Sequence, residues 1–91
     1  MTFEEARKQI VSAIHVITGA LDDKTYAGKL NGKNGDVTLS ELDIDSLAAM
    51  AVCLEIENGT GVTIDLGDLA SYPSVNGLAR LLAGRASANV G

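Results

Sequence analysis

The sequence predicts an all-α domain: a four-helix bundle with three long helices, one short helix and a long first loop. The chain has 91 residues, which is the size of one small domain. Its composition is 46% hydrophobic but includes only one Phe and two Tyr. A core must therefore come from Ala, Leu, Ile and Val, which favours helices over a β-sandwich. Apolar residues that recur at the helical period support the same fold class.

The first helix is expected over residues 3–18. Thr2 and Glu5 have the spacing of a capping box, and Gly19 supplies a stop signal. His15 falls on the polar face. The opposite face is apolar and is expected to be buried: Phe3, Ala6, Ile10, Ala13, Ile14 and Ile17.

Residues 21–41 read as a long loop, because the stretch contains three glycines and two asparagines and its periodicity is weak. Loops of this length are uncommon in compact domains. The segment is therefore expected either to hold a helical turn or to wrap the core through Tyr26, Leu30, Val37 and Leu39.

The second helix is expected to begin at Ser46 and to end near Asn58 and Gly59. It carries two apolar groups on nearly opposite sides. The first group, expected to face the core, is Ala49, Val52, Cys53 and Ile56; the second is Leu47, Met50, Ala51 and Leu54. A small bundle usually buries one stripe of a helix. The second stripe is thus either a docking surface for a partner or a face covered by the long loop.

The last third of the chain predicts a short extended piece over residues 62–65 and one helical turn over residues 66–70, capped by Asp65. Tyr72-Pro73 breaks the chain, and Ser74 caps the closing helix. The apolar face of this helix is Val75, Leu78, Ala79 and Leu82. The folded domain is expected to cover residues 1–84, with a flexible tail over residues 85–91.

Charge and composition argue against several classes. The net charge is −5, and an acidic domain is repelled by nucleic acid phosphates. No apolar run approaches the ~20 residues of a membrane span, and the N-terminus lacks a signal-peptide pattern. The single cysteine, Cys53, allows neither an intrachain disulfide nor a Cys-based zinc site, and we interpret it as a small buried hydrophobe. We expect a monomer in the cytoplasm.

Residues 32–43 partly resemble a calcium-binding loop. Oxygen-bearing side chains fall at the ligand spacing: Asn34, Asp36, Thr38, Ser40 and Asp43. However, Gly32 stands where a first carboxylate is needed, and Val37 stands where the sharp turn requires glycine. We therefore expect no metal site.

Ser46 is the candidate functional residue, and three interpretations arise. It can be an N-cap, although Asp45 suits that position equally well. It can be a hydrolytic nucleophile, but the only histidine is His15 and no Gly-x-Ser-x-Gly turn is present. It can also be a site that another enzyme modifies.

A resemblance favours the third interpretation. Leu42-Asp43-Ile44-Asp45-Ser46-Leu47, followed by an apolar helix, resembles the attachment motif Leu-Gly-x-Asp-Ser-Leu of acyl and peptidyl carrier proteins. Residues 54–84 continue the family's order of a helix end, a Gly-hydrophobic-x-Ile-Asp piece, a short helix and a closing helix after Pro. The likeness covers residues 41–84, about half the chain, and the ordered set is much more specific than the motif alone.

The resemblance implies a helical bundle of the carrier-protein type that carries 4′-phosphopantetheine, donated by coenzyme A, on Ser46. Asp45 and Leu47 flank the site. The protein would hold acyl or aminoacyl cargo as a thioester and would be a substrate of other enzymes rather than an enzyme. The implied partners are a phosphopantetheinyl transferase and loading and condensing enzymes, which we expect to contact Leu47, Met50 and Leu54.

Several positions depart from the family pattern. Asp43 replaces the motif glycine, so either the loop runs differently or Asp43 adopts a left-handed conformation. Thr60 replaces an aromatic residue, and alanines stand where fatty-acid carriers usually have acids: Ala48, Ala49 and Ala51. These departures favour a discrete carrier of a polyketide or nonribosomal-peptide type pathway, or of a specialised fatty-acid pathway. The alternative is an unmodified helical adaptor that uses the same apolar stripe, with Ser46 only a cap.

Overall fold

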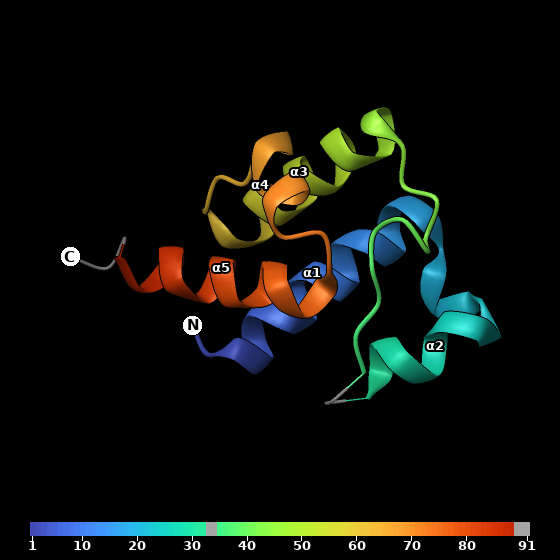
Figure 1. Ribbon diagram of the computed structural model, residues 1–91. Helices are drawn as coiled ribbons and strands as arrows, with labels where there is room; N and C mark the ends of the chain where they lie inside the picture. The colour runs from blue at the N-terminus through green and yellow to red at the C-terminus, as the bar shows by residue number, and fades with distance from the viewer. Residues whose placement is uncertain (33–34, 89–91) are drawn as a thin grey trace.

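The computed structural model describes residues 1–32 and 35–88 and confirms the all-α class (Figure 1). No strand occurs within these ranges, although an isolated bridge pairs Thr38 with Ser74. The expected three long helices and one short helix are present, and one further helix lies in the first loop. The elements are α1 (Phe3–Thr18), the 3-10 turn η1 (Ala20–Asp22), α2 (Lys24–Asn31), α3 (Ser46–Thr60), α4 (Leu66–Ser71) and α5 (Val75–Ala88).

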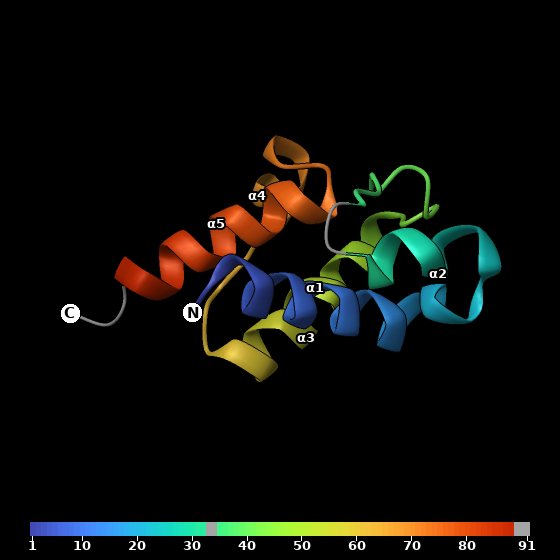
Figure 2. The same cartoon turned by 90° about the horizontal axis from the view of Figure 1, so that it is seen from below.

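Helix α1 runs through the bundle and packs on both α3 and α5 (Figures 1 and 2). Its predicted ends are confirmed: Thr2 and Glu5 form the capping box, and Gly19 ends the helix in the left-handed conformation. The predicted apolar faces meet between the three long helices. The buried residues of this core include Ala6, Ile10 and Ile14 of α1, Val52 and Ile56 of α3, and Val75, Leu78, Ala79 and Leu82 of α5.

The first loop combines the two alternatives expected for it, and its helical part is longer than the single turn that was expected. Residues 24–31 form α2, which Asp23 caps by accepting the N–H of Thr25 at 2.8 Å. Only one residue of α2, Leu30, is buried, which explains why the segment shows little periodicity. The second half of the loop does wrap the core as predicted, since Val37 and Leu39 are buried.

A buried arginine that the sequence analysis did not single out fixes this loop. Arg7 of α1 is only 8% exposed, and its guanidinium donates to the carbonyl groups of Lys29, Leu30 and Gly35 at 2.7 to 2.8 Å. Lys29 and Leu30 lie in the last turn of α2, where carbonyl groups lack intrahelical donors and the helix dipole is negative. Nε of Arg7 also donates to the side chain of Asn76, so one residue ties α1 to α2 and α5.

Two predicted helix ends were placed too early. Helix α3 continues to Thr60 and ends at Gly61, which has a φ of +73°. Helix α5 begins after Ser74, whose hydroxyl accepts the N–H of Gly77 as a cap, and it continues to Ala88. Residues 85–88 are helical, so the closing helix extends past the predicted boundary at residue 84. Residues 89–91 lie outside the described residues. None of the described helices is both long and apolar enough to cross a membrane.

Candidate functional site

The turn that leads into α3 is anchored to the start of α5. The N–H of Leu39 donates to the carbonyl of Pro73 at 2.9 Å, and the N–H of Val75 donates to the carbonyl of Val37 at 3.0 Å. Both Val37 and Leu39 are buried, so hydrogen bonds and apolar contacts act on the same short stretch. The point at which the chain enters α3 at Ser46 is therefore held against the body of the domain.

Within this turn, Asp43 adopts the left-handed conformation. Its φ is +54°, and it is the only non-glycine residue with a positive φ in the described ranges. The N–H of Asp43 donates to the carbonyl of Ser40 at 3.1 Å, which closes the turn. Asp tolerates this region better than most side chains, at a cost of roughly 1 kcal/mol. Asp43 thus adopts the left-handed conformation at the position where the attachment motif has glycine. This was one of the two alternatives expected from the sequence.

Asp45, and not Ser46, caps α3. Asp45 is extended, and its carboxylate accepts the N–H of Ala48 at 2.8 Å. Ser46 is the first helical residue, and it is exposed. Its hydroxyl forms no hydrogen bond with any of the residues that the structure describes. The interpretation of Ser46 as the cap is therefore wrong, and its hydroxyl is left free at the surface.

The two apolar groups of α3 have opposite environments. Ala49, Val52, Cys53 and Ile56 are at most 9% exposed, whereas Leu47, Met50 and Leu54 are 79%, 51% and 60% exposed. We call the latter three residues the exposed stripe. The alternative that the first loop covers this stripe is wrong for the described part of that loop. Burial also raises the pKa of the Cys53 thiol, with smaller contributions from the carboxylates of Asp65 and Asp68, as expected for an unreactive core cysteine.

A cavity of about 320 Å³ opens beside Ser46. It lies between the turn that leads into α3, the start of α3 and the short helix α4. Its lining is mainly apolar: Leu39, Ser40, Ile44, Asp45, Ser46, Ala49, Leu66, Leu69, Ala70 and Pro73. The space beside the free hydroxyl is thus bounded by two elements that are well anchored and by one that is short.

The geometry gives little support to a hydrolytic role for Ser46 or to a calcium site in residues 32–43. His15 lines a different cavity from Ser46, and its Nδ1 accepts the N–H of Leu21 at 3.2 Å. In the segment that resembles a calcium loop, the Asp36 carboxylate accepts the N–H groups of Val37 and Asn76. Asn34 of that segment lies outside the described residues, and no cluster of three potential metal ligands occurs among the residues described.

A comparison with known protein families identifies the kind of site. The family described as "Phosphopantetheine attachment site" matches residues 27–82. The chain belongs to this family of carrier proteins. Searches of curated proteins and of solved structures gave no significant match. Carrier proteins of this family bear a covalently attached 4′-phosphopantetheine and act as acyl carriers rather than as catalysts.

The residues at the start of α3 fit this prosthetic group. Helix geometry leaves the N–H groups of Ser46 and Leu47 without intrahelical acceptors, and the positive end of the helix dipole favours a phosphodiester there. Ser46 is exposed, which leaves a tether on its hydroxyl room to extend. Ser46 also lines the apolar cavity, so a group attached to its hydroxyl has both solvent and a less polar space beside it.

The α4 wall of this cavity was not predicted from the sequence. A turn capped by Asp65 was expected, but not that Leu66, Leu69 and Ala70 would line the space beside Ser46. The available signal was Asp68, which lies three positions after Asp65 and completes a capping box. That signal predicts the start of the helix and carries no information on what the helix faces.

Proposed function

We propose that Ser46 carries the 4′-phosphopantetheine and that the chain is a discrete carrier of acyl or aminoacyl thioesters. The observation that supports this most directly is the division of labour at the start of α3. Asp45 supplies the cap, so the hydroxyl of Ser46 is exposed and unengaged at the position that matches the attachment serine. A serine that served only as a cap would direct its oxygen to the helix backbone.

In the attachment reaction, the oxygen of Ser46 forms a bond to the phosphorus that bears the pantetheine of coenzyme A. The pyrophosphate bond of coenzyme A breaks, adenosine 3′,5′-bisphosphate leaves, and the hydroxyl gives up its proton. The N–H groups at the start of α3 lie where they can stabilise the phosphodiester that remains. The attached arm supplies a terminal thiol for thioester formation, and its length lets one cargo reach several partner enzymes at high effective concentration.

We further propose that the exposed stripe contacts the phosphopantetheinyl transferase and the loading and condensing enzymes. The stripe begins one residue after Ser46, so a partner that reaches the hydroxyl also meets Leu47. The first turn of α3 contains no acidic residue, which supports docking by apolar contact. This feature favours a polyketide or nonribosomal-peptide type pathway, or a specialised fatty-acid pathway. We also propose that the chain acts in the cytoplasm. The chain has no catalytic role of its own in this proposal.

The test is modification of the intact protein. The chain is incubated with coenzyme A, magnesium and a promiscuous phosphopantetheinyl transferase, and its mass is measured. We expect a gain of one phosphopantetheine in the wild type and in Ser12→Ala, an exposed serine of α1 that serves as the control, and no gain in Ser46→Ala.

The alternative of an unmodified adaptor is separated by the same measurement. An adaptor that binds through the exposed stripe has no need of a modified serine. An unchanged mass of the wild type, while a known carrier protein is modified under the same conditions, would favour the adaptor. A gain of mass that persists in Ser46→Ala would instead place the attachment at another residue.

A further inference from the structure

Helix α4 forms one wall of the cavity beside Ser46, but little of it is buried. It has six residues, all of them described, and only Leu69 among them is buried. A helix of this length is not stable on its own, because too few hydrogen bonds offset the cost of starting it. Its position must therefore come from contacts with its neighbours.

A bidentate ion pair joins α4 to α5. Both terminal nitrogens of Arg85 donate to Asp68, one to each carboxylate oxygen, and the second of these bonds measures 2.8 Å. The first nitrogen also donates to the carbonyl of Thr63, in the segment that enters α4, at 3.2 Å. Paired bonds of this type are stronger and more directional than a single contact. The Asp68 side chain is 14% exposed, so solvent screens the pair only in part.

The same carboxylate also starts α4. One oxygen of Asp68 accepts the N–H of Asp65 at 3.0 Å, and the Asp65 carboxylate accepts the N–H of Asp68 at 2.8 Å. The hydrogen bonds from Arg85 lower the pKa of Asp68 to about 2, so the pair stays charged at neutral pH. One side chain therefore both caps α4 and attaches it to α5.

We propose that the Arg85–Asp68 pair is a latch that holds α4 in place as the wall of the cavity, and that its release lets α4 move away from α3. The consequence for the carrier rests on the proposed function: when α4 moves, the space beside Ser46 widens for the arm and its cargo. The latch itself is a property of the unmodified chain.

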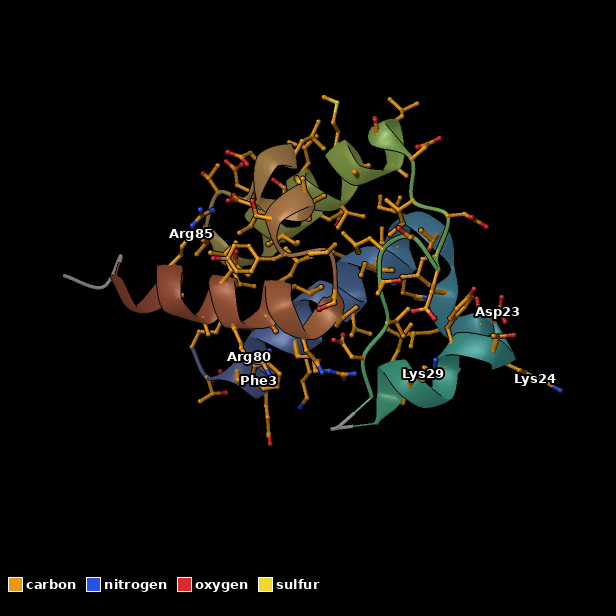
Figure 3. The ribbon with its side chains drawn as sticks, viewed as in Figure 1. Phe3, Asp23, Lys24, Lys29, Arg80 and Arg85 are labelled. Atoms are coloured by element: carbon orange, nitrogen blue, oxygen red, sulfur yellow. The ribbon has the colours of Figure 1, made fainter. Side chains whose placement is uncertain are left out.

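The latch is tested by amide hydrogen exchange on the unmodified protein. In Arg85→Met, we expect the amides of residues 66–71 to exchange roughly fivefold faster, which corresponds to the loss of a partly exposed ion pair, while the α1 amides change by less than about twofold. Arg80→Met is the matched control. Arg80 lies on the same helix, but its guanidinium lies 5.6 Å from the centre of the Phe3 ring, whereas Arg85 lies on the α4 side (Figure 3). We expect α4 exchange in this variant to equal that of the wild type.

Two results would overturn the latch. In the first, α4 exchanges in Arg85→Met at the wild-type rate. In the second, α1 and α4 accelerate together, which would make Arg85 a general stabilising residue. Should Arg85→Met fail to fold, Arg85→Lys retains the charge but not the paired geometry and should show a smaller acceleration confined to α4. Because Ser46 is unmodified in these samples, the outcome is independent of whether it accepts the arm.

Discussion

Helix α3 presents the same kinds of side chain to two opposite environments. Its inner face, which we define as Ala49, Val52, Cys53 and Ile56, is buried in the hydrophobic core, while the exposed stripe faces solvent. Both faces are aliphatic or sulfur-bearing, and neither carries a charge. The difference between them therefore arises from where α1 and α4, the helices that pack on α3, lie and not from the chemistry of the residues themselves.

This contrast indicates what an apolar residue contributes in each setting. On the inner face, each methyl group removed leaves a space that neighbouring side chains cannot fully close. On the exposed stripe, the same methyl group contacts water and contributes little to stability. Retaining three large apolar side chains at the surface beside Ser46 is consistent with the proposed contact with partner enzymes.

The largest expected effect tests the inner face. Replacing Ile56, which is 1% exposed, with Ala should lower the free energy of unfolding by about 3 kcal/mol, because it removes buried methyl groups and leaves a cavity. Urea denaturation followed by circular dichroism measures this change. Leu54→Ala on the exposed stripe is the matched control, with an expected change within ~0.5 kcal/mol. Equal losses in the two variants would mean that the stripe is covered in solution.

The exposed stripe is expected to affect contact with partner enzymes more than stability. Met50→Asp places a charge where the proposed partner makes apolar contact, so kcat/KM of the phosphopantetheinyl transferase should fall roughly tenfold. The stability should change little, because Met50 is 51% exposed. Val16→Asp on α1 provides the control, since Val16 is similarly exposed, at 61%, but lies outside the stripe. A loss of the same size in Val16→Asp would point to net charge rather than to docking.

The elements of the fold that sequence predicted well are those with strong local signals. The start of α1 follows from Thr2 and Glu5, and its end follows from Gly19. Only a helical turn was expected where α2 forms, because the full helix depends on tertiary contacts through Leu30 and Arg7. A lone buried leucine in eight residues gives no period to detect.

The candidate site shows the same division. The motif predicted where Ser46 lies, and the tolerance of Asp for the left-handed region predicted Asp43. The inner face of α3 was predicted correctly, but periodicity alone does not fix which face is buried, because that depends on the placement of the other helices. The pairing of Asp68 with Arg85 joins residues 17 positions apart in the sequence. No local pattern contains such a contact.

The smallest expected effect concerns Asp68 of α4. Its carboxylate acts on the inner face of α3, because it contributes to raising the pKa of the Cys53 thiol. The pKa of Asp68 is lowered from 3.8 to about 2, chiefly by Arg85. Because the pKa of Asp68 is lower in the folded state than in the unfolded state, its ionisation stabilises the folded protein at pH values above the pKa of the unfolded state. We therefore expect roughly 1 kcal/mol of stability, reduced by the partial exposure of Arg85, to be present above about pH 4 and to be lost as the pH falls toward 2. Urea unfolding between pH 2 and 6 measures this stability as the difference between the wild type and Arg85→Met.

The pKa values of Glu5 and Glu41 are also lowered, but both proteins share these groups, so their contribution cancels in that difference. If the free energy of unfolding varies with pH in the same way in both proteins, the Arg85–Asp68 pair contributes no stability in this pH range.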